Sequence, residues 1–180
     1  MATVPSTLVF VTGQVVTAAQ LNGNPGGTWG PFVLGAPECQ VRQTVSQNMT
    51  TSVWTSVTFD TEDQDTDNWH SVVANTQQVK PQTPGWVRVS GGVSFGTNAT
   101  GRRATRWLLN GSVVPGSRVI LPATATGGAS VPARTMVIQV NGSTDEIELQ
   151  GFQESGGTLA TDVSVIEAQS SFTAEWRGTQ

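Results

Sequence analysis

Hydrophobic and polar residues alternate in short runs along most of the chain beyond residue 38. Between residues 86 and 95, one face of the alternating pattern carries Val87, Val89, Val93 and Phe95. This alternation is typical of a strand with one buried face. Comparable runs, each bounded by turn residues, predict further strands at 39–45, 53–59, 72–73, 103–109, 131–140, 146–152, 161–165 and 170–176.

Two Asn-Gly pairs, Asn110-Gly111 and Asn141-Gly142, follow strand-like runs. A tight hairpin turn needs positive φ at both central positions, which Asn and Gly tolerate. We therefore expect a hairpin at each pair, the second joining 131–140 to 146–152. About eight to ten strands with no helix between them predict an all-β domain, either a two-sheet sandwich, a barrel or a jelly roll.

Residues 1–37 follow a different pattern. Thr17 and Gln20 fit a capping box, which predicts one short helical turn that ends at Gly23. Segment 23–31 is rich in Gly and Pro and is typical of a linker or a strap over a surface. Such an arm cannot form a core, so its apolar side chains need the following domain or another protein as a partner. The side chains expected to anchor the arm are Phe10, Val15, Val16, Leu21 and Trp29. The chain is thus predicted to contain an anchoring arm at 1–37 and a β domain at 38–180.

The low charge of the chain narrows the classes of function. Charged residues make up 12%, the net charge is -4 and the pI is about 4.8, so no basic field is available for a nucleic-acid backbone. No run approaches the length of a membrane span, and the first residues lack the basic and apolar regions of a secretory signal. We expect synthesis in a cytoplasm, without nucleic-acid binding or membrane insertion.

Cys39 and His70 are the single cysteine and the single histidine. An intrachain disulfide and any metal site with two imidazoles are therefore excluded, and a catalytic triad would have to use His70. We expect Cys39 to be a small buried residue and His70 a partly exposed polar one. A glycosidase would depend on paired carboxylates, for which Asp60, Glu62 and Glu154 are the candidates, but the sequence does not give their separation. The prediction is a protein without enzymatic activity or a cofactor.

Residues 60–67 hold five of the 13 acidic residues. Asp63, Asp65 and Asp67 have the spacing that opens a calcium-binding loop, but Asn68 and Ala74 stand where an EF-hand needs Gly and Glu. Three alternatives remain: an irregular Ca²⁺ site, a solvated acidic loop, and an acidic patch that meets arginines of a neighbouring subunit.

Arginines gather at 102–106, and strand alternation places Arg103 on one face with Thr105 and Trp107. They could form an ordinary charged sheet edge or a subunit interface, because arginine is the preferred partner of carboxylates. The interface candidates are Arg103, Arg106, Trp107, Phe172 and Trp176. Trp69, beside the acidic stretch, is the candidate platform for stacking a sugar.

Several segments resemble the central signature of C1q/TNF-like domains. They are Phe59, Asn68-Trp69-His70, Val79-Lys80-Pro81 and Pro84-Gly85-Trp86-Val87-Arg88-Val89, with Asn141 to Leu149 similar to the penultimate hairpin and Ser170 to Trp176 to the last strand. The resemblance spans roughly 39–178, although Ala174 replaces a usual Gly and the chain has no Tyr. It implies a ten-stranded jelly-roll sandwich that forms a homotrimer and has no enzymatic activity.

The arm resembles proteins of a different kind. The segment from Gly13 to Asn22 is similar to a segment near the N-termini of tail and appendage proteins of tailed phages. Together with the C1q-like domain, it makes the chain resemble small virion proteins of phages that infect actinobacteria. The resemblance implies a virion location, contacts with other virion proteins through residues 1–37, and possible binding of a host cell-surface glycan.

Two virion roles remain open. One is a trimeric minor tail protein or receptor-binding appendage, and the other is a capsid decoration protein or head fibre at three-fold positions of the capsid. A monomeric sugar-binding module unrelated to virions is a third interpretation.

Overall fold

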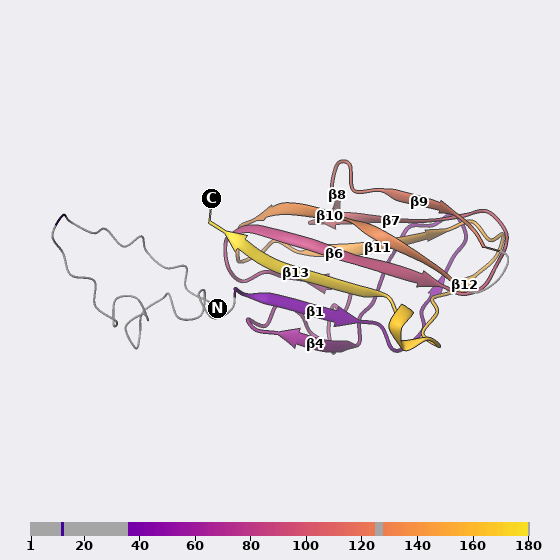
Figure 1. Cartoon of the computed structure of the whole chain (residues 1–180), viewed down its shortest axis with the longest axis horizontal. Helices are drawn as coiled ribbons and strands as arrows, with labels where there is room; N and C mark the ends of the chain where they lie inside the picture. The colour runs from indigo at the N-terminus through magenta and orange to yellow at the C-terminus, as the bar shows by residue number, and fades with distance from the viewer. Residues whose placement is uncertain (1–11, 13–35, 125–127, 180) are drawn as a thin grey trace.

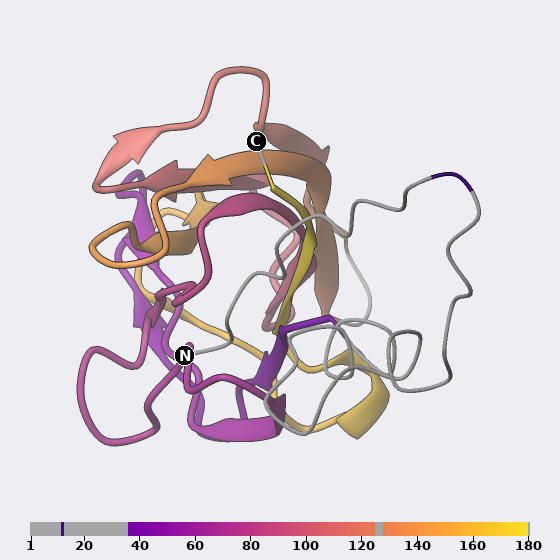
Figure 2. The ribbon, with the colours of Figure 1, turned by 90° about the vertical axis from the view of Figure 1, so that its left-hand side faces the viewer.

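Two antiparallel sheets face each other in the computed structural model, which describes residue 12, residues 36–124 and residues 128–179 (Figure 1). One sheet has the order β10-β6-β13-β1-β4. Its strands are β1 (Glu38–Arg42), β4 (Thr61–Asp65), β6 (Gly85–Phe95), β10 (Ala129–Val140) and β13 (Ser171–Gly178). All pairs are antiparallel. The view along the strands in Figure 2 shows the two sheets enclosing the space between them.

The second sheet has the order β3-β11-β7-β8, with β5 paired to β11 and β9 paired to β7. Its strands are β3 (Thr55–Ser56), β5 (Gln78–Val79), β7 (Arg102–Leu109), β8 (Ser112–Val113), β9 (Val119–Pro122) and β11 (Ile147–Gln153). β2 (Asn48–Met49) and β12 (Leu159–Ala160) form a separate small pair, and a 3₁₀ turn occupies Ile166–Ala168. The expected all-β jelly-roll sandwich is therefore confirmed.

The core lies between the two sheets. Val87, Val89, Val93 and Phe95 on β6 are all buried, as the alternation predicted. At the centre Phe172 contacts the Trp107 ring, with the ring centroids 4.8 Å apart. Cys39 is also buried, and burial raises the pKa of its thiol, with smaller contributions from the charges of Asp65 and Glu62. The thiol thus behaves as a small apolar group.

The two Asn-Gly turns differ. Asn110 (φ 51°) and Gly111 (φ 73°) join β7 to β8, which pair as a hairpin, so this prediction is confirmed. The second prediction is wrong, because Asn141-Gly142 links β10 in one sheet to β11 in the other. The Asn141 side-chain oxygen accepts hydrogen bonds from the backbone amides of Ser143 and Thr144, at 2.9 and 3.0 Å. An asparagine that caps its own loop stabilises a crossover as readily as a hairpin.

Other expected elements also changed. The stretch 60–67 is not a loop, because Thr61–Asp65 forms β4, the edge strand beside β1. Its charged side chains suit an edge, where they oppose pairing with another chain. Residues 72–73 are not a strand, and of the predicted strand 161–165 only Thr161 pairs, in an isolated bridge with Phe95. β9 was not predicted. The expected helical turn at 17–23 lies outside the described residues. None of the helical segments in the described part of the chain has the length and apolar character needed to cross a membrane.

Candidate functional site

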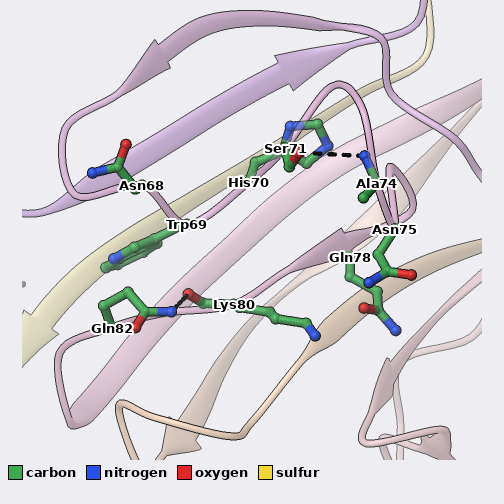
Figure 3. A pocket seen from close by; sticks show the side chains of 9 residues that line it. All are labelled: Asn68, Trp69, His70, Ser71, Ala74, Asn75, Gln78, Lys80 and Gln82. Carbon is green, nitrogen blue, oxygen red and sulfur yellow. Dashed lines mark hydrogen bonds between the residues drawn. The ribbon is translucent and has the colours of Figure 1, made fainter.

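A polar pocket of about 270 Å³ lies between the loop that follows β4 and the segment around β5 (Figure 3). Four of its lining side chains are amides, namely Asn68, Asn75, Gln78 and Gln82. Lys80 also lines the pocket and forms an ion pair with Glu146 at 3.3 Å. An amide can both donate and accept, so this lining matches groups that do the same.

The Asp65 carboxylate holds the pocket loop in place. It accepts hydrogen bonds from the backbone amides of Trp69 and His70, both at 2.9 Å, and of Asp67 at 3.3 Å. Asn68 lies inside this turn with φ 54°, a left-handed conformation that asparagine tolerates better than most residues. The acidic stretch therefore supplies the cap of the loop that forms the pocket.

Two aromatic rings line the pocket with their polar atoms turned toward the protein. The Trp69 indole N–H donates to Asp67 at 3.3 Å. The His70 ring nitrogens lie 2.9 Å from Glu62 Oε1 and 3.0 Å from the Thr76 carbonyl oxygen. The His70 side chain is fully buried, whereas the residue as a whole is partly exposed, as expected. Trp69 is 1% exposed, so the predicted sugar-stacking platform is wrong: packing in the core leaves only part of its ring at the pocket.

The three calcium candidates do not converge. Asp63 pairs with Arg42 at 2.8 Å, Asp65 accepts the loop amides, and Asp67 accepts from Trp69 and from the Thr83 hydroxyl at 3.1 Å. Across residues 36–124 and 128–179, no group of three His, Cys, Asp or Glu side chains is placed to hold a metal ion. The Ca²⁺ site proposed for these aspartates is therefore contradicted by their geometry. The arginine that pairs with Asp63 belongs to the same chain and not to a neighbouring subunit, as the third alternative had required.

Three of the five interface candidates lie inside a single copy of the chain. Arg103, Trp107 and Phe172 are fully buried, so they have no surface to offer another subunit and the prediction is wrong for them. Arg103 donates to the carbonyl oxygens of Asn98, Thr100 and Arg102 at 3.0 to 3.1 Å, and burial lowers its pKa. The predicted shared face of Arg103, Thr105 and Trp107 is nevertheless confirmed, since all three point inward.

Arg106 and Trp176 remain candidates. Arg106 is half-buried, and its guanidinium carbon lies 4.1 Å from the centroid of the Trp54 ring. Trp176 is half-buried and its indole N–H donates to the Pro84 carbonyl oxygen at 3.0 Å. Neither contact removes the whole side chain from solvent, so their role at an interface stays a prediction.

The carboxylates considered for catalysis each have a separate structural partner. Asp60 accepts from Thr44 and Val45, Glu62 contacts His70, and Glu154 pairs with Arg102. Burial raises the pKa of Asp60, but its hydrogen bonds outweigh this and hold the pKa below the ordinary value. A general acid needs the opposite shift.

Sequence reasoning missed an exposed apolar edge. The edge comprises Val113 on β8, Ile120 and Leu121 on β9, and Val137 on β10, which are 39 to 55% exposed. Val113 and Val137 line an apolar groove of about 300 Å³ between their strands. The run of apolar residues at 119–121 was the available signal. By itself it does not predict an exposed edge, because that depends on the position of β9 beside β10. The arm candidates Phe10, Val15, Val16, Leu21 and Trp29 lie outside the described residues.

Comparison with solved structures shows a TNF-like jelly roll. Murine APRIL at pH 5.0 is similar with a TM-score of 0.57 and 11% identity, over 78% of this chain and 98% of that chain. Eiger TNF from S. frugiperda is similar with a TM-score of 0.54 and 7% identity, over 81% of this chain and 95% of that chain. No protein-family profile and no curated protein sequence matches the chain. At such low sequence identity, the likeness shows a shared fold and nothing further.

Proposed function

We propose that the chain is a non-enzymatic structural protein of a phage virion, a homotrimeric minor tail protein or receptor-binding appendage that residues 1–37 attach to the particle. The observation that carries the oligomer is the apolar edge of Val113, Ile120, Leu121 and Val137. Large apolar side chains gathered at one edge are typical of a protein-protein contact. The virion role rests on the resemblance of the arm to phage tail proteins.

A closed ring of three copies needs two different surfaces, because each copy gives one surface and receives the other. The apolar edge would be the first. The second would be the outer face of the β10-β6-β13-β1-β4 sheet, which carries exposed Trp86 and, farther along β6, the small side chain of Ser90 directly opposite Thr173. Small residues permit close approach, and tryptophan is enriched at interfaces.

Light scattering on the purified full chain tests the oligomer. We expect a mass three times that of the 18.9 kDa chain. The double variant Val113→Lys/Val137→Lys should lower that mass, because burying two ammonium groups in the contact is unfavourable. Val73→Lys is the matched control, since Val73 is 89% exposed in the pocket loop away from the edge. A monomeric wild type, or an unchanged mass in the double variant, would contradict the proposal.

Labelling intact particles of the source phage with an antibody against residues 38–180 tests the virion role. Label at the tail tip supports the tail or receptor-binding role. Label over the head supports the alternative of a capsid decoration protein or head fibre. Particles without label would show that the chain has no place on the virion.

A further inference from the structure

We infer that the polar pocket formed by residues 68–82 binds a neutral, hydroxyl-rich ligand about the size of one sugar ring. This inference concerns a site distinct from the apolar edge, and it depends neither on the oligomeric state nor on the virion role. Three observations support it: a hydrogen-bond network that orients the buried acceptor Gln78 Oε1, the side chains that line the pocket, and the volume of the pocket.

A chain of side-chain hydrogen bonds crosses the outer face of the second sheet and ends at the pocket. Arg106 Nε donates to Gln150 Oε1 at 2.7 Å, and Gln150 Nε2 donates to Ser56 Oγ at 3.2 Å. The Ser56 hydroxyl donates to Glu148, which also accepts from Gln78 Nε2 at 3.3 Å. The direction of every bond follows from its ends, because a guanidinium only donates and a carboxylate only accepts.

This network orients the Gln78 amide. A flipped amide would place Gln78 Oε1 against the Glu148 carboxylate, so the nitrogen must face Glu148 and the oxygen must face away. Gln78 Oε1 is buried, and no donor of the described chain reaches it. An unsatisfied buried acceptor is costly, so a ligand group that donates to this oxygen recovers the lost interaction.

The neighbours of Gln78 Oε1 suit a hydroxyl group, which donates and accepts at once. Figure 3 shows the Lys80 side chain extended along the pocket with its ammonium directed toward Gln78. The Lys80 side chain is 40% exposed and can move aside to admit a ligand to the oxygen. Asn75 is exposed on the same side and can donate to the oxygen of that hydroxyl. The Gln82 nitrogen donates to the Lys80 carbonyl at 2.9 Å, which leaves its oxygen for a second hydroxyl.

The rest of the lining favours a neutral ligand. Trp69 and His70 use their ring nitrogens in contacts with the protein, and their side chains have almost no exposed surface, so their polar atoms are not available to a ligand. The single lining cation, Lys80, already has Glu146 as its partner. The volume of about 270 Å³ lies just below the usual range for small-molecule sites and admits a monosaccharide.

Titration of the ¹⁵N-labelled full chain tests the inference. The probes are the methyl glycosides of glucose, galactose, mannose and N-acetylglucosamine, followed by ¹H–¹⁵N spectra that resolve side-chain amides. We expect at least one probe to shift the Asn75, Gln78 and Gln82 amide signals and the Trp69 indole signal. The inference is overturned if none of the four probes shifts them, or if the shifts cluster around Trp54 and Arg106 instead.

Two variants test the pocket directly. Asn75→Gly removes one amide and keeps the backbone, because glycine adopts the φ of 54° without strain. Gln78→Met removes the buried acceptor at similar volume. Each should weaken binding of the responding glycoside about tenfold, the effect of one net hydrogen bond. The control Gln40→Ala, on the exposed face of β1, should bind as the wild type does. Wild-type affinity in a folded Asn75→Gly variant would refute the inference even if Gln78→Met failed to fold.

Discussion

The Asp60 carboxylate ties the end of β1 to the start of β4. Its Oδ1 accepts from the amide and the hydroxyl of Thr44 at 2.8 and 2.7 Å, and its Oδ2 accepts from the Val45 amide at 2.6 Å. Burial raises the pKa of Asp60, but these hydrogen bonds to the charged form prevail and lower it. One side chain therefore links the turn after β1 to the acidic strand.

This contact makes stability depend on pH. A carboxyl with a folded-state pKa below its unfolded value of about 3.9 stabilises the fold above that pH, and the contribution is lost as the pH falls through the folded pKa. Asp60→Asn should therefore lower the urea midpoint at pH 7. Between pH 7 and pH 3, the midpoint of this variant should fall less than that of the wild type. Thr44→Val removes one of the donors to Asp60, so its acid-induced fall in urea midpoint should lie between those of Asp60→Asn and the wild type. An equal acid-induced loss in Asp60→Asn and the wild type would contradict this account.

Gly91 allows β6 to lie close to its neighbour β13. It pairs with Phe172, and a Cβ at this position would collide with the Ser171 carbonyl oxygen. Backbone atoms of a central strand cannot move aside as a flexible side chain can. The glycine is therefore needed for the approach of the two strands rather than for a turn.

Gly91→Ala should destabilise the fold by about 1–3 kcal/mol, the usual cost of forcing an extra methyl group into a packed interior. Gly157→Ala is the matched control, because a Cβ there meets nothing within 4 Å. It should change stability by no more than about 0.5 kcal/mol. Urea unfolding of both variants measures the difference, and equal midpoints would show that the strands separate at little cost.

At the scale of the whole molecule, the described core closes within the β domain. The members of the buried cluster run from Cys39 to Ala174 and include side chains from both sheets. A domain with its own core folds alone. The two-part chain predicted from the pattern, an arm at 1–37 and a domain at 38–180, stays a prediction, because residues 1–11 and 13–35 lie outside the described residues.

A chain that begins at residue 36 should consequently fold with a denaturation midpoint close to that of the full chain and keep the same number of subunits. It should fail to attach to the virion, because the arm is the proposed anchor. Circular dichroism, light scattering and particle binding provide the three measurements. A large drop in the midpoint would mean that residues 1–35 contribute to the domain, and attachment without the arm would remove its proposed role.

Features that depend only on neighbouring residues could be predicted from the sequence. The alternation around β6 predicted its buried face, because side chains on a strand point alternately to its two sides. Asn110-Gly111 predicted its hairpin, because the turn needs positive φ at both positions. The burial of Cys39 and the all-β class followed from the same local patterns.

Contacts across the sandwich could be identified only in the folded molecule. Arg103, Trp107 and Phe172 lie inside one chain, because loop carbonyls and the facing sheet cover them. In the fold, the acidic stretch forms an edge strand beside β1, and Asn141-Gly142 connects a strand of one sheet to a strand of the other. The apolar edge likewise brings β8 and β9 beside β10, and this arrangement depends on long-range packing that no local pattern encodes.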